Sequence, residues 1–317
     1  MAIEPLIELL TSGTERCKSD AVAALGNLAM NVKNRGIIGL KGGIPPLVQL
    51  LHEGTLLIRG RVCATLKHLS HLNSNIKRIG NCNVIPTLIQ ILKDEENDVK
   101  MRANVVECIS YLSLNVTVDD GDILGHIWSI AFEVDRAQAL VSGGVVSLLM
   151  QMITKYTDED IVSNATTTIC NLCRLEQTKV AIFAFVDSVS ALTGIQVLVK
   201  ALYGKSEATK LNAAGALGNL ARRSTQSSTS KAQEEISQAG ALLPLITLLG
   251  STTSRSGRIM LASALYNLGV GHTANREYII KNGSEVIIHV AEDEENFSSD
   301  RIRSLRDMLE NMPPTFA

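Results

Sequence analysis

The 317-residue chain is poor in aromatic residues and has almost no net charge. Aromatic side chains make up 3% of it, and the formal net charge is −2. Because there is no surplus of basic residues, no long-range field draws the protein to nucleic acid or to an anionic lipid surface. So few aromatic rings also provide no stacking platform for single-stranded bases. We therefore expect no nucleic-acid partner.

Long hydrophobic runs are missing as well. No stretch approaches the roughly eighteen apolar residues that a membrane-spanning helix needs. The start, Met1–Pro5, lacks the basic and then apolar segments of a secretion signal. The six cysteines are scattered along the chain, which suits a reducing compartment. We expect a protein of the cytoplasm or the nucleus that has no membrane span.

Residue patterns typical of catalysis or metal binding are also lacking. Cys170 and Cys173 have the spacing of a redox motif or half of a zinc site, but no second pair completes four ligands. The acidic run 119–122 lacks the alternate spacing and the closing glutamate of a calcium loop. No phosphate-binding loop or nucleophile elbow is present. We predict that the protein is not an enzyme and has no cofactor and no metal site.

The chain does contain a repeated phrase. The segment Asp20–Ala29 returns as Asn212–Ala221, and looser copies end at Cys173 and Gly269. A second phrase, of the type Pro-Leu-Ile-Glu-Leu-Leu, precedes each copy. Its anchors lie at residues 5, 46, 87, 147, 197, 244 and 287, with separations of 41, 41, 60, 50, 47 and 43 residues. Periods of about 40 to 47 residues are typical of solenoids with two or three helices per repeat.

Local signals divide each repeat into helices. Ala21, Leu25 and Leu28 follow one another at i, i+4 and i+7, on one helix face. Glycine then ends a short first helix and proline opens a second, as at Gly42-Gly43 and Pro46. The matching signals in later repeats are Gly143-Gly144, Gly240 and Pro244. One repeat cannot bury its own apolar faces, so neighbours must stack and share a core.

The turn Gly42–Val48 and the helix ends Ala-Leu-Gly-Asn-Leu-Ala resemble the armadillo-repeat family, in particular its catenin-like, vacuolar and plant-type members. The resemblance covers nearly the whole chain. It implies an all-α, right-handed superhelical solenoid of about seven repeats with three helices each, the first repeat being truncated. It also implies that the third helices line a concave groove, which in this family typically holds an extended peptide.

We predict a single domain, residues 1–317, because a solenoid grows along one axis. The repeats are expected at about residues 1–31, 32–73, 74–115, 134–174, 175–222, 231–271 and 272–317, with insertions at about 116–133, 183–190 and 223–230.

An asparagine near the end of the third helix is the sharpest functional signal. A carboxamide has both a donor and an acceptor, so it can pair with an extended backbone whatever side chains the peptide has. Stacked helices lie about 8 to 10 Å apart and an extended chain advances about 3.3 Å per residue, so each asparagine would meet every second or third peptide residue. The alternative is that these asparagines cap helices or bridge repeats. In the family they bind the peptide backbone, and by motif the matching residues are Asn27, Asn171, Asn219 and Asn267.

The row is incomplete. His68 and Tyr111 take the asparagine position in the second and third repeats, so the strongest continuous groove is predicted between Asn171 and Asn267. Flanking candidates are Asn164 and Asn212, two turns earlier, and Arg174, Arg222 and Arg223, one turn later. Arginine forks would favour acidic side chains or a carboxylate in the ligand. The alternative is that they are solvated residues at helix ends, where the macrodipole favours a positive charge.

Nuclear-import adaptors, another branch of the family, place a tryptophan one turn before each groove asparagine, where it sandwiches lysine stems. Here those positions hold Ala23, Thr167, Gly215 and Ser263. Recognition of a basic localisation signal is therefore only a third hypothesis.

Two groups of apolar residues would be exposed unless they pack against something. The insertion at 116–133 contains Ile127, Trp128 and Phe132, which would form a sizeable patch if exposed. It either extends a helix over the solenoid edge or acts as a regulatory or partner-binding element near the groove. At the start, Ile3, Leu6 and Leu10 would lack a neighbouring repeat, which predicts a fragment or self-association through the N-terminal edge.

The leading hypothesis is a non-catalytic protein–protein interaction module. It would bind an extended peptide segment of a partner in the groove, as a scaffold or substrate-recruiting domain. The alternative is a structural assembly unit that contacts partners through its edges or convex face.

Overall fold

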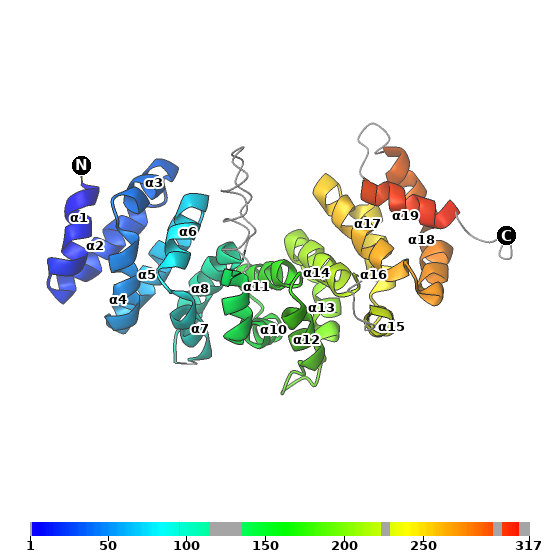
Figure 1. The fold of residues 1–317 in the computed structure, drawn as a ribbon, viewed down its shortest axis with the longest axis horizontal. Helices are drawn as coiled ribbons and strands as arrows, with labels where there is room; N and C mark the ends of the chain where they lie inside the picture. Colours follow the sequence, from blue (N-terminus) through cyan, green and yellow to red (C-terminus); the bar gives the residue numbers. More distant parts are fainter. Residues whose placement is uncertain (1, 95, 114–134, 223–228, 294–299, 311–317) are drawn as a thin grey trace. The chain divides into compact units, whose positions relative to one another are not determined.

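The computed structural model describes residues 2–94, 96–113, 135–222, 229–293 and 300–310 (Figure 1). These residues form helices joined by turns, and the one pairing of extended backbone among them is an isolated antiparallel bridge between Val186 and Thr193. The predicted all-α stack of helical repeats is confirmed. The described residues belong to two compact units, 1–148 and 149–317, which we treat separately. That the whole chain is one domain stays a prediction.

The first unit contains two or three helices for each predicted repeat, and α2, α5 and α8 are the third helices, packed side by side in that order (Figure 1). The first repeat has two helices, as predicted. The helices are α1 (Ile3–Ser12), α2 (Glu15–Leu28), α3 (Val32–Leu40), α4 (Ile44–Glu53), α5 (Leu56–Leu69), α6 (Asn73–Asn81), α7 (Ile85–Lys93), α8 (Val99–Leu112) and the segment Asp135–Ser142. Helix α10 (Val145–Lys155) crosses the boundary between the units.

In the second unit the third helices are α11, α14 and α17, again packed in sequence, and α19 covers α17. Helix α19 is amphipathic, and Ile302 and Leu305 lie on its buried side. The helices are α11 (Glu159–Leu172), α12 (Glu176–Ala184), α13 (Gly194–Ala201), α14 (Glu207–Leu220), α15 (Thr229–Gln238), α16 (Leu242–Ser251), α17 (Arg255–Gly269), α18 (Thr273–Asp293) and α19 (Asp300–Glu310).

Each third helix up to α17 begins at a polar cap. In α8, for example, the Asp98 carboxylate accepts the N–H of Met101, and in α14 the Ser206 hydroxyl accepts the N–H of Thr209. Such a cap stabilises a helix by about 1 kcal/mol. The other capping residues are Thr14, Thr55, Asp158 and Ser254.

The glycine turns lie where the sequence placed them. Gly42, Gly144 and Gly240 have φ of 78°, 84° and 84°, the left-handed conformation that ends a helix. The second helices, however, begin at Ile44 and Leu242, two residues before the prolines that were predicted to open them. The first four N–H groups of a helix need no intrahelical acceptor, so proline is tolerated at the third position.

The last repeat departs from the prediction of three helices per repeat. Helix α18 runs without a break from Thr273 to Asp293, where two helices were expected. Gly283 occupies the turn position but does not adopt a positive φ, and no proline follows it. Since nothing forces a left-handed residue there, the first two helices of this repeat are continuous.

Neighbouring third helices approach each other closely in the second unit. A Cβ atom added to Gly218 of α14 would lie 2.7 Å from the Cα of Ala264 and 2.8 Å from its Cβ, on α17. Both residues are buried in a core of small and branched side chains. Only glycine fits at this crossing.

We expect Gly218→Ala to lower the free energy of unfolding by about 1–3 kcal/mol, because the backbone of α17 must move away. Gly36→Ala is the control, since on α3 an added Cβ would meet only Leu72 Cδ2, at 3.7 Å. That change should be neutral or stabilise by up to about 1 kcal/mol through helix propensity. Urea unfolding followed by circular dichroism measures both, and equal effects would contradict the close approach.

In the described part of the chain no single helix is long and apolar enough to cross a membrane. The bent pair Asp135–Ser142 and Val145–Lys155 passes that test of length and composition only when taken together.

Candidate functional site

The candidate site is the third-helix face, which we define as the asparagine positions of the third helices together with the residues four and seven positions before them. Helical spacing puts these positions on one side of each helix. In the second unit the face consists of Asn164, Thr167 and Asn171 on α11, Asn212, Gly215 and Asn219 on α14, and Met260, Ser263 and Asn267 on α17.

Two of the predicted asparagines bridge successive third helices. Asn219 Nδ2 donates to the carbonyl oxygen of Cys170 at 3.3 Å, and Asn267 Nδ2 donates to that of Gly218 at 3.0 Å. Both side chains are half-buried, and neither Oδ1 has a hydrogen-bond partner among the described residues. The bridging role is therefore present. The amide oxygen and the second N–H of each residue remain unused.

The other predicted residues of this unit lie around these two. Asn212 Nδ2 donates to Thr167 Oγ1 at 2.8 Å, which ties α14 to α11 a second time. Asn164 and Asn171 are half-buried on α11, and Arg174 and Arg222 are exposed just beyond the ends of α11 and α14. Arg223 lies outside the described residues, as do Ile127, Trp128 and Phe132 of the 116–133 insertion.

The insertion at 183–190 comprises the last two residues of α12 and a tight loop after it. The Asp187 carboxylate accepts hydrogen bonds from the N–H of Ser190 at 2.7 Å and from its hydroxyl at 2.6 Å. These bonds lower the pKa of Asp187 below its ordinary value. The loop leaves Val189 94% exposed.

In the first unit, titratable side chains replace the row of amides. His71 Nε2 lies 3.1 Å from Glu107 Oε1, and Lys67 Nζ lies 3.4 Å from Glu107 Oε2. The rings of His71 and Tyr111 are 4.5 Å apart between centroids. Burial, followed by the charges of Lys67 and His71, lowers the pKa of His68. Where the row of asparagines was predicted to be interrupted, the structure therefore has a cluster of ionisable side chains. The remaining predicted residue of this unit, Asn27 on α2, is exposed.

Three segments of the chain, residues 2–30, 134–174 and 192–222, match the family model of the Armadillo/beta-catenin-like repeat. They fall within the first, fourth and fifth predicted repeats, and the last match covers residues 192–222 of the predicted 175–222. The chain is an armadillo-repeat protein.

Solved structures with a similar fold include engineered armadillo proteins. A designed armadillo repeat protein is 19% identical, with a TM-score of 0.64 over 84% of this chain and 99% of that one. Another, crystallised in complex with peptide (KR)4, is 18% identical, with a TM-score of 0.61 over 84% of this chain and 100% of that one. An engineered protein is 22% identical, with a TM-score of 0.64 over 86% of this chain and 98% of that one. No curated protein sequence matches the chain.

One functional candidate on this armadillo face was missed by the sequence analysis. Asn104 lies seven residues before Tyr111 on α8, the position that Asn164 and Asn212 occupy in their own repeats. Its side chain is 8% exposed and has no hydrogen-bond partner among the described residues. Counting back from Tyr111 as from the asparagines would have found it.

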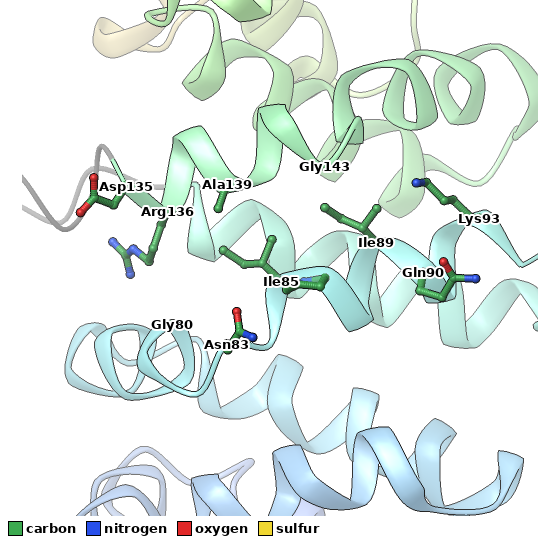
Figure 2. A pocket seen from close by; sticks show the side chains of 11 residues that line it. Gly80, Asn83, Ile85, Ile89, Gln90, Lys93, Asp135, Arg136, Ala139 and Gly143 are labelled. Carbon is green, nitrogen blue, oxygen red and sulfur yellow. The ribbon is translucent and has the colours of Figure 1, made fainter.

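A cavity of about 370 Å³ lies away from the armadillo third helices, between α7 and the segment Asp135–Ser142 (Figure 2). Ile85, Ile89 and Ala139 line it, with Asp135 and the buried Arg136 at one end (Figure 2). First and second helices form this cavity, so it is separate from the third-helix face.

Cys170 and Cys173 serve packing. Cys170 and Cys173 are buried, and burial raises the pKa of Cys170 to about 11 and that of Cys173 well above its ordinary value. Thiols held in the protonated form are poor nucleophiles and poor metal ligands. Among the described residues no group of three His, Cys, Asp or Glu side chains is placed to hold a metal ion.

The environment of His68 predicts a pH effect. Because its pKa in the folded state is below that of the unfolded chain, its contribution to stability is fully present above the unfolded value of about 6.5 and is lost as the pH falls through the folded pKa. Acidification from about pH 7.5 to about pH 5.5 should therefore lower the melting temperature less in His68→Gln than in the wild type. An NMR titration should give His68 a midpoint below the ordinary value of a histidine side chain, and a midpoint at or above that value would contradict its described surroundings.

Proposed function

We propose that the protein is a non-catalytic interaction module that binds an extended peptide segment of a partner protein along the third-helix face. It would act in the cytoplasm or the nucleus, as a scaffold or as a substrate-recruiting domain. One observation carries the proposal: Asn219 and Asn267 are fixed by bonds to the preceding helix, and each keeps an unused amide oxygen and N–H.

The bridging bond prepares these amides for a ligand. An asparagine side chain that is free to rotate loses entropy when it binds, whereas one held by a hydrogen bond has already lost much of it. The remaining acceptor and donor suit the N–H and C=O of a peptide backbone. Bridging repeats and binding a peptide, which the sequence posed as alternatives, are therefore compatible in the same residue.

Side-chain preference would come from the flanks of the face. Exposed Arg174 and Arg222 favour acidic residues in the ligand, because guanidinium groups pair well with carboxylates. A lysine sandwich is less well supported, since a Cβ at Gly215 would lie 2.7 Å from Cys170 Sγ and 2.9 Å from Met260 Sδ. A tryptophan cannot occupy that position without repacking. This argues against the third hypothesis, a nuclear-import adaptor.

The alternative, a structural assembly unit, has one observation in its favour. Val186 and Val189 are 59% and 94% exposed on the loop pinned by Asp187, away from the asparagine row. Self-association through the N-terminal edge would likewise use α1, where Leu9 is 37% exposed.

The double variant Asn219→Ala/Asn267→Ala separates the two proposals. Peptides are first selected on the wild-type chain from a displayed random library, and their affinity is then measured by fluorescence anisotropy. The variant should bind at least about tenfold more weakly, since two hydrogen bonds to the ligand are lost.

Each alanine also removes a bridge between repeats and costs about 1 kcal/mol of stability. Gln233→Ala is therefore the matched control. Buried on α15, Gln233 donates to the carbonyls of Asn267 at 2.7 Å and Val270 at 2.9 Å, and its loss should weaken folding but not peptide affinity. Unchanged affinity in the double variant would favour the assembly unit.

A further inference from the structure

A pocket of about 460 Å³ opens in the first unit between α5 and α8. Its lining includes Leu57, Arg61 and Ala64 of α5 and Lys100 and Asn104 of α8. Leu57, Arg61 and Ala64 are spaced by four and three residues and lead to His68, so the pocket lies on the third-helix face. We propose that this pocket takes a bulky aliphatic or aromatic side chain of the bound peptide, and that Asn104 holds the peptide backbone beside it. The inference rests on the proposed function and specifies which kind of side chain the bound peptide must carry.

The walls of the pocket are apolar and partly open to water. Leu56 and Leu57 are 59% and 62% exposed at one side, while the buried Met101 forms the floor. Gly60 leaves the space above that floor empty, since an added Cβ would come within 3.3 Å of Met101 Cε and meet nothing else within 4 Å. Neighbouring exposed leucines beside a hollow are typical of a binding surface.

Asn104 supplies the polar half of the site. Asn104 is 8% exposed and has no hydrogen-bond partner among the described residues. Its amide atoms are not among the fully enclosed polar atoms without a partner, so they are open to the pocket that Asn104 lines and can bond to a ligand there. A peptide backbone that crosses the pocket would offer it both a donor and an acceptor.

Comparison with the second unit explains why Asn104 lacks a partner. There Asn212, at the matching position, donates to Thr167 Oγ1 on the preceding third helix at 2.8 Å. The residue of α5 that corresponds to Thr167 is Ala64, which has no hydroxyl. The asparagine at this position is therefore hydrogen-bonded within the protein in the second unit, as Asn212, and is available to a ligand in the first, as Asn104.

The charged residues around the pocket do not favour a ligand of either charge. Arg61 pairs with Asp20 at 3.2 Å, and the carboxylate of Asp98, which caps α8, lies in the same lining as Lys100. Apolar volume and backbone hydrogen bonding therefore decide what binds.

The decisive variants are Ala64→Thr and Ala64→Val, which add side chains of nearly equal volume. Threonine would give Asn104 the internal partner that Asn212 has, whereas valine would not. With a peptide selected on the wild-type chain, affinity should fall about tenfold further in the threonine variant than in the valine variant. Equal affinities would overturn the role of Asn104.

A small probe tests the pocket without a selected peptide. On adding N-acetyl-leucine methylamide to the full chain, the NMR signals of the Met101 methyl group and the Asn104 side-chain amide should shift. N-acetyl-alanine methylamide should shift them much less. Gly60→Leu fills the pocket and should abolish the response, while Gly36→Leu on α3 should keep it. No shift with the leucine probe would overturn the apolar subsite.

The two proposals fail differently. If selected peptides lose affinity in Asn219→Ala/Asn267→Ala but bind Gly60→Leu and Ala64→Thr like the wild type, the groove binds peptide and this inference is wrong. If the library yields no binding peptide, the proposed function fails, and this inference fails with it.

Discussion

The structure depends on how closely one third helix can approach the next. At Gly218 the backbones of α14 and α17 lie so close that no Cβ atom fits between them. The carbonyl oxygen of the same glycine accepts a hydrogen bond from the side-chain amide of Asn267. The close approach of the helices and this hydrogen bond depend on each other, because a side chain at residue 218 would push the helices apart and move the acceptor out of reach of Asn267. In the first unit Gly26 of α2 makes the corresponding approach to α5, where an added Cβ would lie 2.7 Å from Thr65 Oγ1.

The phrase Ala-Leu-Gly-Asn-Leu-Ala therefore has two functions in the stack. Its small residues allow the helices to touch, and its asparagine crosses the contact with a directional bond. Dispersion between packed helices is large but does not select a register, whereas a hydrogen bond to one carbonyl does. A repeat protein needs such selection, because each repeat contacts only its neighbours and an error would propagate along the stack.

The sequence predicted well where a local signal has a single structural meaning. Gly42 and Gly240 end helices because a residue in the left-handed conformation is required there. The interruption of the asparagine row could be read directly from the sequence, which has His68 and Tyr111 at those positions. The continuous helix α18 was missed because a glycine at a turn position permits a turn without enforcing one. The state of Asn104 was beyond sequence reasoning for another reason. Whether an amide has a partner depends on a residue about one repeat away, and spacing along one helix cannot show it.

The third helices of the two units carry different side chains at corresponding positions. In the second unit the amides of Asn219 and Asn267 are tied to the preceding helix, and Gly215 lies against the side chains of Cys170 and Met260. In the first, an ionisable cluster around His71 stands at those positions, beside a pocket with leucine walls. Hydrogen bonds to a backbone are indifferent to peptide sequence, whereas a pocket of defined volume is not. In the first unit the pocket would therefore determine which ligand binds, so partner specificity should be sought in α5 and α8.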